Sequence, residues 1–337
     1  MRPIRLSHLF VSIAAAALVA ATNAPTYEVT GAIPGPDGGW DYASVDPAAH
    51  TLYVAHGDAV MAADLANGNA VRSLGKIAKA HAVVPIPGKN LLLVSSAHDD
   101  TVRLLDTVDG HEIANIAVGS DPDAAFYDAA SGHAVVMNAK GGTVSIIDVA
   151  AQKVVGTIPL KAGLEFGVMG EGKTLFVNNE DTNEIEIADL GTQKVGKAIA
   201  MPGCEGPTGL GYDAATHLLI SACANGKAAL IDAQTRRVVR LLDIGKGPDA
   251  VLIDTARRLA FIPCGASGTI SVIALDGAMG AAVVGTIASE KGARTGALDP
   301  ASGNLYLPTA HFGPPATSGG RPVAIPGTFH VAIITPR

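Results

Sequence analysis

The sequence predicts an all-β protein, a seven-bladed β-propeller with four antiparallel strands in each blade. Three observations lead to this prediction. A unit of about 40 to 45 residues recurs seven times along the chain. Each unit contains four short apolar segments separated by turn residues, and no segment sustains the 3.6-residue apolar period of a helix. Repeats of this length with four strands each are typical of propeller blades.

The first strand of each unit is the clearest recurring element. Residues 41–46, 123–128 and 249–254 all begin and end with aspartate around an apolar stretch. We call the polar starting position of this strand the first slot. Consecutive first slots are 40 to 45 residues apart, and over the seven units they hold Asp41, His81, Asp123, Glu165, Thr208, Asp249 and Arg294.

The second, third and fourth strands follow in each unit. Second strands are compact and apolar, as in residues 91–94, and third strands end in an aspartate. Aspartate in this position accepts hydrogen bonds from the backbone of a following turn. We therefore expect turn-capping roles for Asp64, Asp106, Asp148, Asp189 and Asp232.

The last unit is short of one strand, because only three residues follow Ile334. Residues 26–33 have strand composition and belong to no unit of their own. We expect this N-terminal strand to complete the last blade and close the ring, which would remove the exposed sheet edge of an open array.

The N-terminus resembles a secretory signal peptide. Arg2 and Arg5 precede an apolar run at residues 9–21 that is too short to span a membrane, and small residues follow it. We predict a signal peptide at residues 1–24, cleaved near residues 21–24, and a single propeller domain at residues 25–337. A retained signal anchor is the alternative. No later run reaches 18 apolar residues, so we expect no membrane span and a periplasmic or secreted location.

Several strand motifs point to a known repeat. They are Leu-Tyr-Val-Ala at 52–55, Leu-Phe-Val-Asn-Asn at 175–179, Gly-Thr-Val-Ser-Ile-Ile-Asp at 142–148 and Thr-Ile-Pro at 157–159. Over residues 26–337 the chain resembles the YVTN-type β-propeller repeats of the YncE-like family of secreted bacterial proteins. The resemblance implies a periplasmic or extracellular seven-bladed propeller. It implies no single activity, because propellers host many functions.

Composition narrows the possible partners. The chain has 24 Lys and Arg against 31 Asp and Glu, a net charge of −7, and only 4% aromatic residues. DNA binding, suggested for some relatives, would need backbone-tracking positive charge and stacking platforms that this composition lacks. Phosphate-binding loops and the nucleophile elbow of hydrolases are absent from the sequence.

The three cysteines suggest one disulfide. If Tyr212 faces His217 across the hairpin, Cys204 falls within two residues of the position opposite Cys223. Cys264 occupies the place of Cys223 one unit later, and equivalent strands of adjacent blades lie farther apart than the ~7 Å Cα limit of a disulfide. We expect a Cys204–Cys223 bond and a free Cys264; three buried thiols are the alternative.

The first slots are the candidate binding site. First strands line the central channel of a propeller, so these seven residues should ring one end of it, which we call the channel mouth. Concave polar sites of this kind are where propellers bind ligands. The alternative is a solvated ring that pairs with itself, with His81 between Asp41 and Asp123, and Arg294 beside Asp41 and Asp249.

Three loop histidines are candidate metal ligands. His56, His98 and His311 lie between second and third strands of units one, two and seven, which are neighbours in a closed ring. Imidazole suits Zn, Cu, Fe or Ni. The cofactor is otherwise unknown, and a divalent metal ion is the one candidate. We expect structural roles for the other histidines, at positions 50, 111, 133, 217 and 330. The insertion at residues 311–327 should lie on the same face, as a partial lid or a loose loop.

These features favour an exported, monomeric, non-catalytic protein that binds a small molecule or a protein partner, or acts as a scaffold, through its channel-mouth face. The alternative is a metal-assisted hydrolase of lactonase type, in which a divalent ion among the carboxylates polarises a carbonyl group. Two carboxylates and a third ligand converging on one point would favour the hydrolase. An exposed apolar patch would favour a scaffold.

Overall fold

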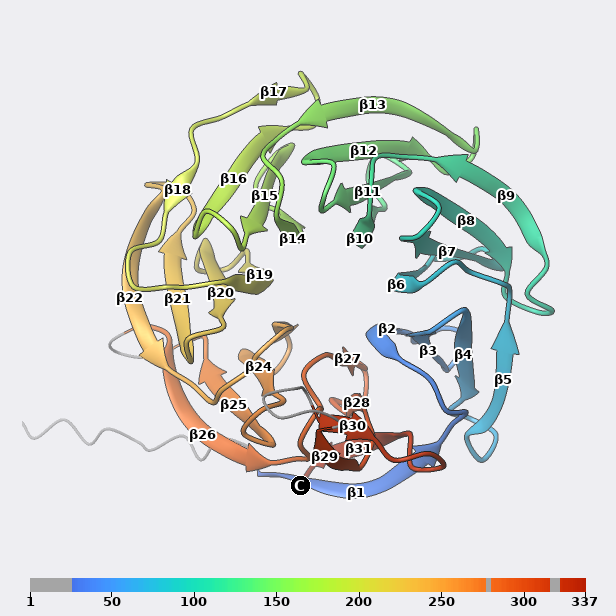
Figure 1. The fold of residues 1–337 in the computed structure, drawn as a ribbon. Helices are drawn as coiled ribbons and strands as arrows, with labels where there is room; N and C mark the ends of the chain where they lie inside the picture. Colours follow the sequence, from blue (N-terminus) through green and yellow to red (C-terminus); the bar gives the residue numbers. More distant parts are fainter. Residues whose placement is uncertain (1–25, 277–279, 316–321) are drawn as a thin grey trace, which may run out of the picture.

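Seven antiparallel sheets of four strands surround a central axis, which confirms the predicted propeller (Figure 1). The computed structural model describes residues 26–276, 280–315 and 322–337. The predicted signal peptide at residues 1–24, with its cleavage near residues 21–24, lies outside the described residues, as does the middle of the insertion. Within the described ranges, no helix has the length and apolar character needed to cross a membrane.

The first three blades follow one another regularly. Blade 1 contains β2 (Trp40–Asp46), β3 (Thr51–His56), β4 (Ala59–Asp64) and β5 (Ala70–Leu74). Blade 2 contains β6 (Ala80–Pro85), β7 (Leu91–Ser96), β8 (Thr101–Asp106) and β9 (Glu112–Ala117). Blade 3 contains β10 (Pro122–Asp128), β11 (His133–Asn138), β12 (Thr143–Asp148) and β13 (Lys153–Pro159).

The next three blades differ slightly at their edges. Blade 4 contains β14 (Leu164–Met169), β15 (Thr174–Asn179) and β16 (Glu184–Asp189), and its outer edge is divided into β17 (Lys194–Val195) and β18 (Ile199–Ala200). Blade 5 contains β19 (Pro207–Asp213), β20 (Leu218–Cys223), β21 (Lys227–Asp232) and β22 (Arg237–Asp243). Blade 6 contains β23 (Leu252–Asp254), β24 (Leu259–Cys264), β25 (Thr269–Ala274) and β26 (Ala282–Ala288).

Blade 7 joins the two ends of the chain. It contains β27 (Ala297–Leu298), β28 (Leu305–Thr309), β31 (His330–Pro336) and, as its outer strand, β1 (Tyr27–Pro34). β1 pairs antiparallel with β31 from Tyr27 opposite Pro336 to Pro34 opposite His330, which confirms the predicted closure of the ring. The insertion carries its own hairpin, β29 (Phe312–Pro315) with β30 (Pro322–Ala324).

The hydrophobic core is divided into seven clusters, one at each junction between adjacent blades. Both faces of a blade are therefore covered by its neighbours. This explains why second strands are buried along almost their whole length, with every residue of β3 and β24 buried. β1 contributes to two junctions, because Tyr27 packs between blades 6 and 7 and Ile33 between blades 7 and 1.

The predicted turn caps are confirmed. A carboxylate oxygen of each third-strand aspartate accepts a backbone N–H two or three residues later. The distance is 2.7 Å from Val108 to Asp106 and 2.6 Å from Thr192 to Asp189. Equivalent bonds are made by Asp64, Asp148 and Asp232.

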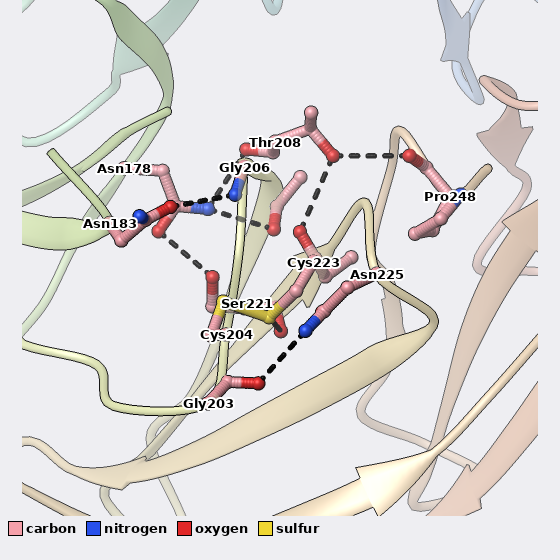
Figure 2. The surroundings of a disulfide bond; sticks show 12 residues. Asn178, Asn183, Gly203, Cys204, Gly206, Thr208, Ser221, Cys223, Asn225 and Pro248 are labelled. Carbon is pink, nitrogen blue, oxygen red and sulfur yellow. Dashed lines mark hydrogen bonds between the residues drawn. A yellow bond between two sulfur atoms is a disulfide. The ribbon is translucent and has the colours of Figure 1, made fainter. Parts of the chain in front are cut away.

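The predicted disulfide is present between Cys204 and Cys223, whose Cα atoms lie 5.4 Å apart, and Cys264 is free and buried (Figure 2). The expected strand register was wrong by two residues. Tyr212 faces Leu219 rather than His217, because the ladder begins at Asp213 and Leu218 and residues 214–217 form the turn. The pairing of the cysteines tolerates this shift, since Cys204 lies in the loop before β19.

Candidate functional site

A β-bulge places the first-slot side chains at the channel mouth. In blades 1 to 5 the residue before the slot pairs with the end of the second strand, as in Trp40 with His56. The register then shifts before pairing resumes, so the slot residue makes no ladder pair. Bulges of this kind redirect a side chain away from the regular alternation of a strand. The position of the site is thus built into the backbone of the repeat.

His81 lies between two carboxylates, as the self-paired alternative expected. Its Nδ1 is 2.5 Å from Asp41 Oδ2 and 3.0 Å from Asp123 Oδ1. Burial alone would lower the pKa of His81, but hydrogen bonds to Asp123 and Asp41, with their negative charges, raise it to about 9. Burial raises the pKa of Asp41, and the bond to His81 offsets part of that rise. At neutral pH His81 is therefore an imidazolium held by its two neighbours.

Arg294 forms the second ion pair of the mouth. Its Nε is 2.6 Å from Asp249 Oδ2, and its Nη2 is 4.0 Å from Asp41 Oδ1. Burial, with the charge of Asp41, raises the pKa of Asp249 to about 7 despite Arg294. Burial and the charges of Asp123 and Asp249 raise the pKa of Glu165 to about 10. Glu165 is therefore a neutral carboxylic acid, and the two cations nearly balance the remaining carboxylates.

Two aromatic rings meet beneath the mouth. The centroids of Tyr42, from blade 1, and Phe166, from blade 4, are 5.3 Å apart. Because β2 and β14 lie on opposite sides of the ring, this contact crosses the channel (Figure 1). A small cavity of about 100 Å³ lies beside the pair and is lined by the first strands of blades 1 to 4, 6 and 7. Burial raises the pKa of Tyr42 well above its ordinary value, with the mouth carboxylates adding to the rise.

Thr208 has a different role from the ionic slot residues. Its hydroxyl donates to the carbonyl oxygens of Pro248, at 3.2 Å, and Ala222, at 3.4 Å (Figure 2). It therefore connects blade 5 to the loop that leads into blade 6. Asn178 of blade 4 reaches the same strand, because its amide donates to the carbonyl oxygen of Thr208 at 2.9 Å.

A cleft of about 720 Å³ opens beside the channel mouth, between blades 6, 7 and 1 and the hairpin of the insertion. We call it the aromatic cleft. Its lining combines two aromatic rings, two cations and flat glycine-rich backbone: Gly39, Trp40, Gly247, Gly265, Ala266, Lys291, Gly292, Arg294, Phe312 and Pro322. Gly292 has φ +91°, and a Cβ there would lie 2.3 Å from the Phe312 ring. The Phe312 ring therefore packs against a backbone that only glycine can provide.

Among the described residues, the three candidate metal-binding histidines form no group with ligand atoms within 4.8 Å of one another. His56 is buried against Phe329, with ring centroids 4.4 Å apart, and its Nε2 has no hydrogen-bond partner among the described residues. His98 is exposed. His311 instead lies beside Glu290 and His330.

Sequence reasoning missed several residues of this face, including Tyr42, Phe166, Lys291 and Phe312. One signal was available for the first two. The residue after the first slot is small in five units, where it is Ala82, Ala124, Gly209, Ala250 or Thr295. Tyr42 and Phe166 are the two large exceptions, and they are the pair that meets across the channel.

Fold and site together define a seven-bladed β-propeller with a charged, largely self-paired mouth and an aromatic cleft beside it. No family model and no curated protein matches the chain. Among solved structures, a chain of hydrazine synthase from Kuenenia stuttgartiensis is similar, with a TM-score of 0.69 and 15% identity over 87% of this chain and 96% of that one. A chain of a mitotic checkpoint complex has a TM-score of 0.72 and 14% identity, covering 99% and 98%. At these identities the similarity shows the fold alone.

Proposed function

We propose that this protein is an exported, monomeric binding propeller of the YVTN type, located in the periplasm or secreted. We further propose that its ligand is a small organic anion with a flat apolar or aromatic part, bound in the aromatic cleft. The predicted signal peptide supports export, and the recurring strand motifs support the repeat type. The composition of the cleft carries the proposal for the ligand.

The cleft offers positive charge that the channel mouth does not. Among its described lining residues, Lys291 and Arg294 are cationic and none is acidic. At the mouth His81 and Arg294 already pair with carboxylates, Arg294 with Asp249, so Lys291 supplies the positive charge that is particular to the cleft. Arginine and lysine form strong charge-assisted bonds to carboxylates and phosphates. Trp40 and Phe312, whose centroids are 6.2 Å apart, can contact a flat ring. The volume of about 720 Å³ lies within the ~300–1,000 Å³ typical of small-molecule sites.

Trp40 provides the test, because it is the only tryptophan of the chain and it lines the cleft. We expect aromatic carboxylates to change its fluorescence and the matching neutral amides to bind at least about tenfold more weakly, since a charge-assisted bond is worth ~1.5–3 kcal/mol. Lys291→Gln should weaken the carboxylates to a similar extent. Lys140→Gln is the control, because this lysine is 75% exposed on blade 3. Equal affinities for acids and amides would contradict the proposal.

A metal-assisted hydrolase is the second candidate, and one observation favours it. Asp41, His81 and Asp123 each offer a ligand atom within 4.8 Å of the others, which is the convergence that such a site requires. A divalent ion there would have to replace the proton that His81 shares with its two neighbours, and it would then polarise a substrate carbonyl. The test is titration of calcium and zinc into the wild type and Asp123→Asn, followed by lactone hydrolysis assays. Metal binding lost in the variant, together with hydrolysis by the wild type, would support this function over simple binding.

A further inference from the structure

A carboxylate and two imidazoles come together where blade 7 meets the loop that leads into it, and none of the three is a channel-mouth residue. Glu290 lies in the loop between β26 and β27, His311 directly precedes β29, and His330 begins β31. One ligand atom of each lies within 4.8 Å of the other two. The three residues come from separate segments of the chain, so only the fold brings them together.

The orientation of His330 is fixed by the backbone. Its Nδ1 is 2.8 Å from the carbonyl oxygen of Thr328. Because a carbonyl oxygen only accepts, Nδ1 carries the proton. Nε2 lies 3.1 Å from Glu290 Oε1. Two lone pairs would otherwise face each other across this contact, so a proton or a metal ion must lie between the nitrogen and the oxygen. Metal-binding histidines characteristically donate their other N–H to a carbonyl or carboxylate in this way.

His311 is held close to the same carboxylate. Its Nε2 is 3.9 Å from Glu290 Oε2, and its ring centroid is 5.7 Å from that of His330. Hydrogen bonds fix its backbone, since its N–H donates to Thr328 Oγ1 and its carbonyl accepts from the N–H of Ile325. Zinc–ligand bonds of about 2.05 Å at the tetrahedral angle separate ligand atoms by roughly 3.3 Å. The observed separations lie on either side of that value.

We propose that Glu290, His311 and His330 bind one zinc ion, with water in the remaining coordination position. Two imidazoles and one carboxylate form a donor set that zinc commonly takes with an open position. The ion would connect His311, at the start of the insertion, and His330, which begins β31, to the loop after blade 6. Lys291 and Phe312 directly follow two of the ligands and line the aromatic cleft. Zinc would thereby hold that wall of the cleft in place.

The test is isothermal titration of zinc chloride into the chelator-treated full-length protein. We expect one equivalent to bind to the wild type. Glu290→Gln, His311→Asn and His330→Asn should each weaken binding by at least about 100-fold, since even supporting residues of a metal site contribute ~10–100-fold. His330→Asn is the sharpest variant, because asparagine keeps a donor near the Nδ1 position and removes Nε2. Zinc should raise the melting temperature of the wild type and not that of the variants.

His50→Asn is the matched control, because His50 is an exposed turn residue with φ 47°, a conformation that asparagine tolerates. It should bind zinc as the wild type does. A circular dichroism spectrum and a zinc-free melting temperature equal to those of the wild type would show that each variant is folded. Equal zinc affinity in the wild type and His330→Asn would overturn the proposal, and so would an absence of binding. Loss of binding in Asp123→Asn but not in His330→Asn would assign the ion to the channel mouth and would also overturn it.

Discussion

The substitution Ile33→Ala tests how strongly β1 closes the ring. Ile33 is completely buried at the junction of blades 7 and 1, where it packs with residues of both blades. Truncating a fully buried isoleucine to alanine typically costs 2–5 kcal/mol, and we expect about 3 kcal/mol. Unfolding entropy near 2.1 cal/mol/K per residue gives about 0.65 kcal/mol/K for a ring of about 310 residues, so the melting temperature should fall by about 5 °C.

Val29→Ala provides the matched control in the same strand. Its side chain is 44% exposed, so its truncation should change the stability by less than about 0.5 kcal/mol. The assay is scanning calorimetry of both variants and the wild type, with light scattering to detect aggregation. A weakened β1 would expose β31 as an unpaired edge strand, so Ile33→Ala should also aggregate at a lower temperature. Equal melting temperatures for the two variants would refute the idea that β1 closes the ring through its buried side chains.

Three further predictions concern other parts of the ring. A thiol reagent under denaturing, non-reducing conditions should label Cys264 alone, and three labelled cysteines per chain would contradict the disulfide. Arg258→Met should cost about 3–5 kcal/mol by urea denaturation, because it leaves the buried Asp213 carboxylate without its two bonds of 2.6 and 2.7 Å; recovery of stability in Arg258→Met/Asp213→Asn is the check. The pKa of His81 is raised to about 9, so its contribution to stability should be full below about pH 6.5 and lost as the pH rises through 9; an identical pH profile for His81→Gln would show that the ion pairs add nothing.

The repeat made the architecture predictable from sequence. A period of about 42 residues and four strands per period are local properties, and the N-terminal strand was needed simply because the last unit had no room for its own. The Cys204–Cys223 bond was likewise predictable, because both residues belong to one hairpin region. The predicted neighbours of His81 and Arg294 also followed from the order of the blades.

Contacts between distant blades and contacts around the insertion were harder to predict from the sequence. Tyr42 and Phe166 are three blades apart, and no local pattern measures a distance across a ring. His330 had the sequence context of an ordinary strand end, yet in the fold its ring lies next to that of His311. The prediction that His56, His98 and His311 form one site assumed that loops at the same place in each repeat have the same conformation. The actual loops differ, since His56 turns into the core against Phe329.

The contact between Tyr42 and Phe166 braces the ring across its central channel. Blades that touch only their neighbours could slide in small, coordinated steps, and the circle could flatten into an oval without separating any junction. A contact between blades 1 and 4 spans the diameter and opposes that deformation. The two rings also occupy part of the axis, beside the cavity of about 100 Å³ that the first strands line. Blades 1 and 4 are therefore mechanically coupled, although they share no junction.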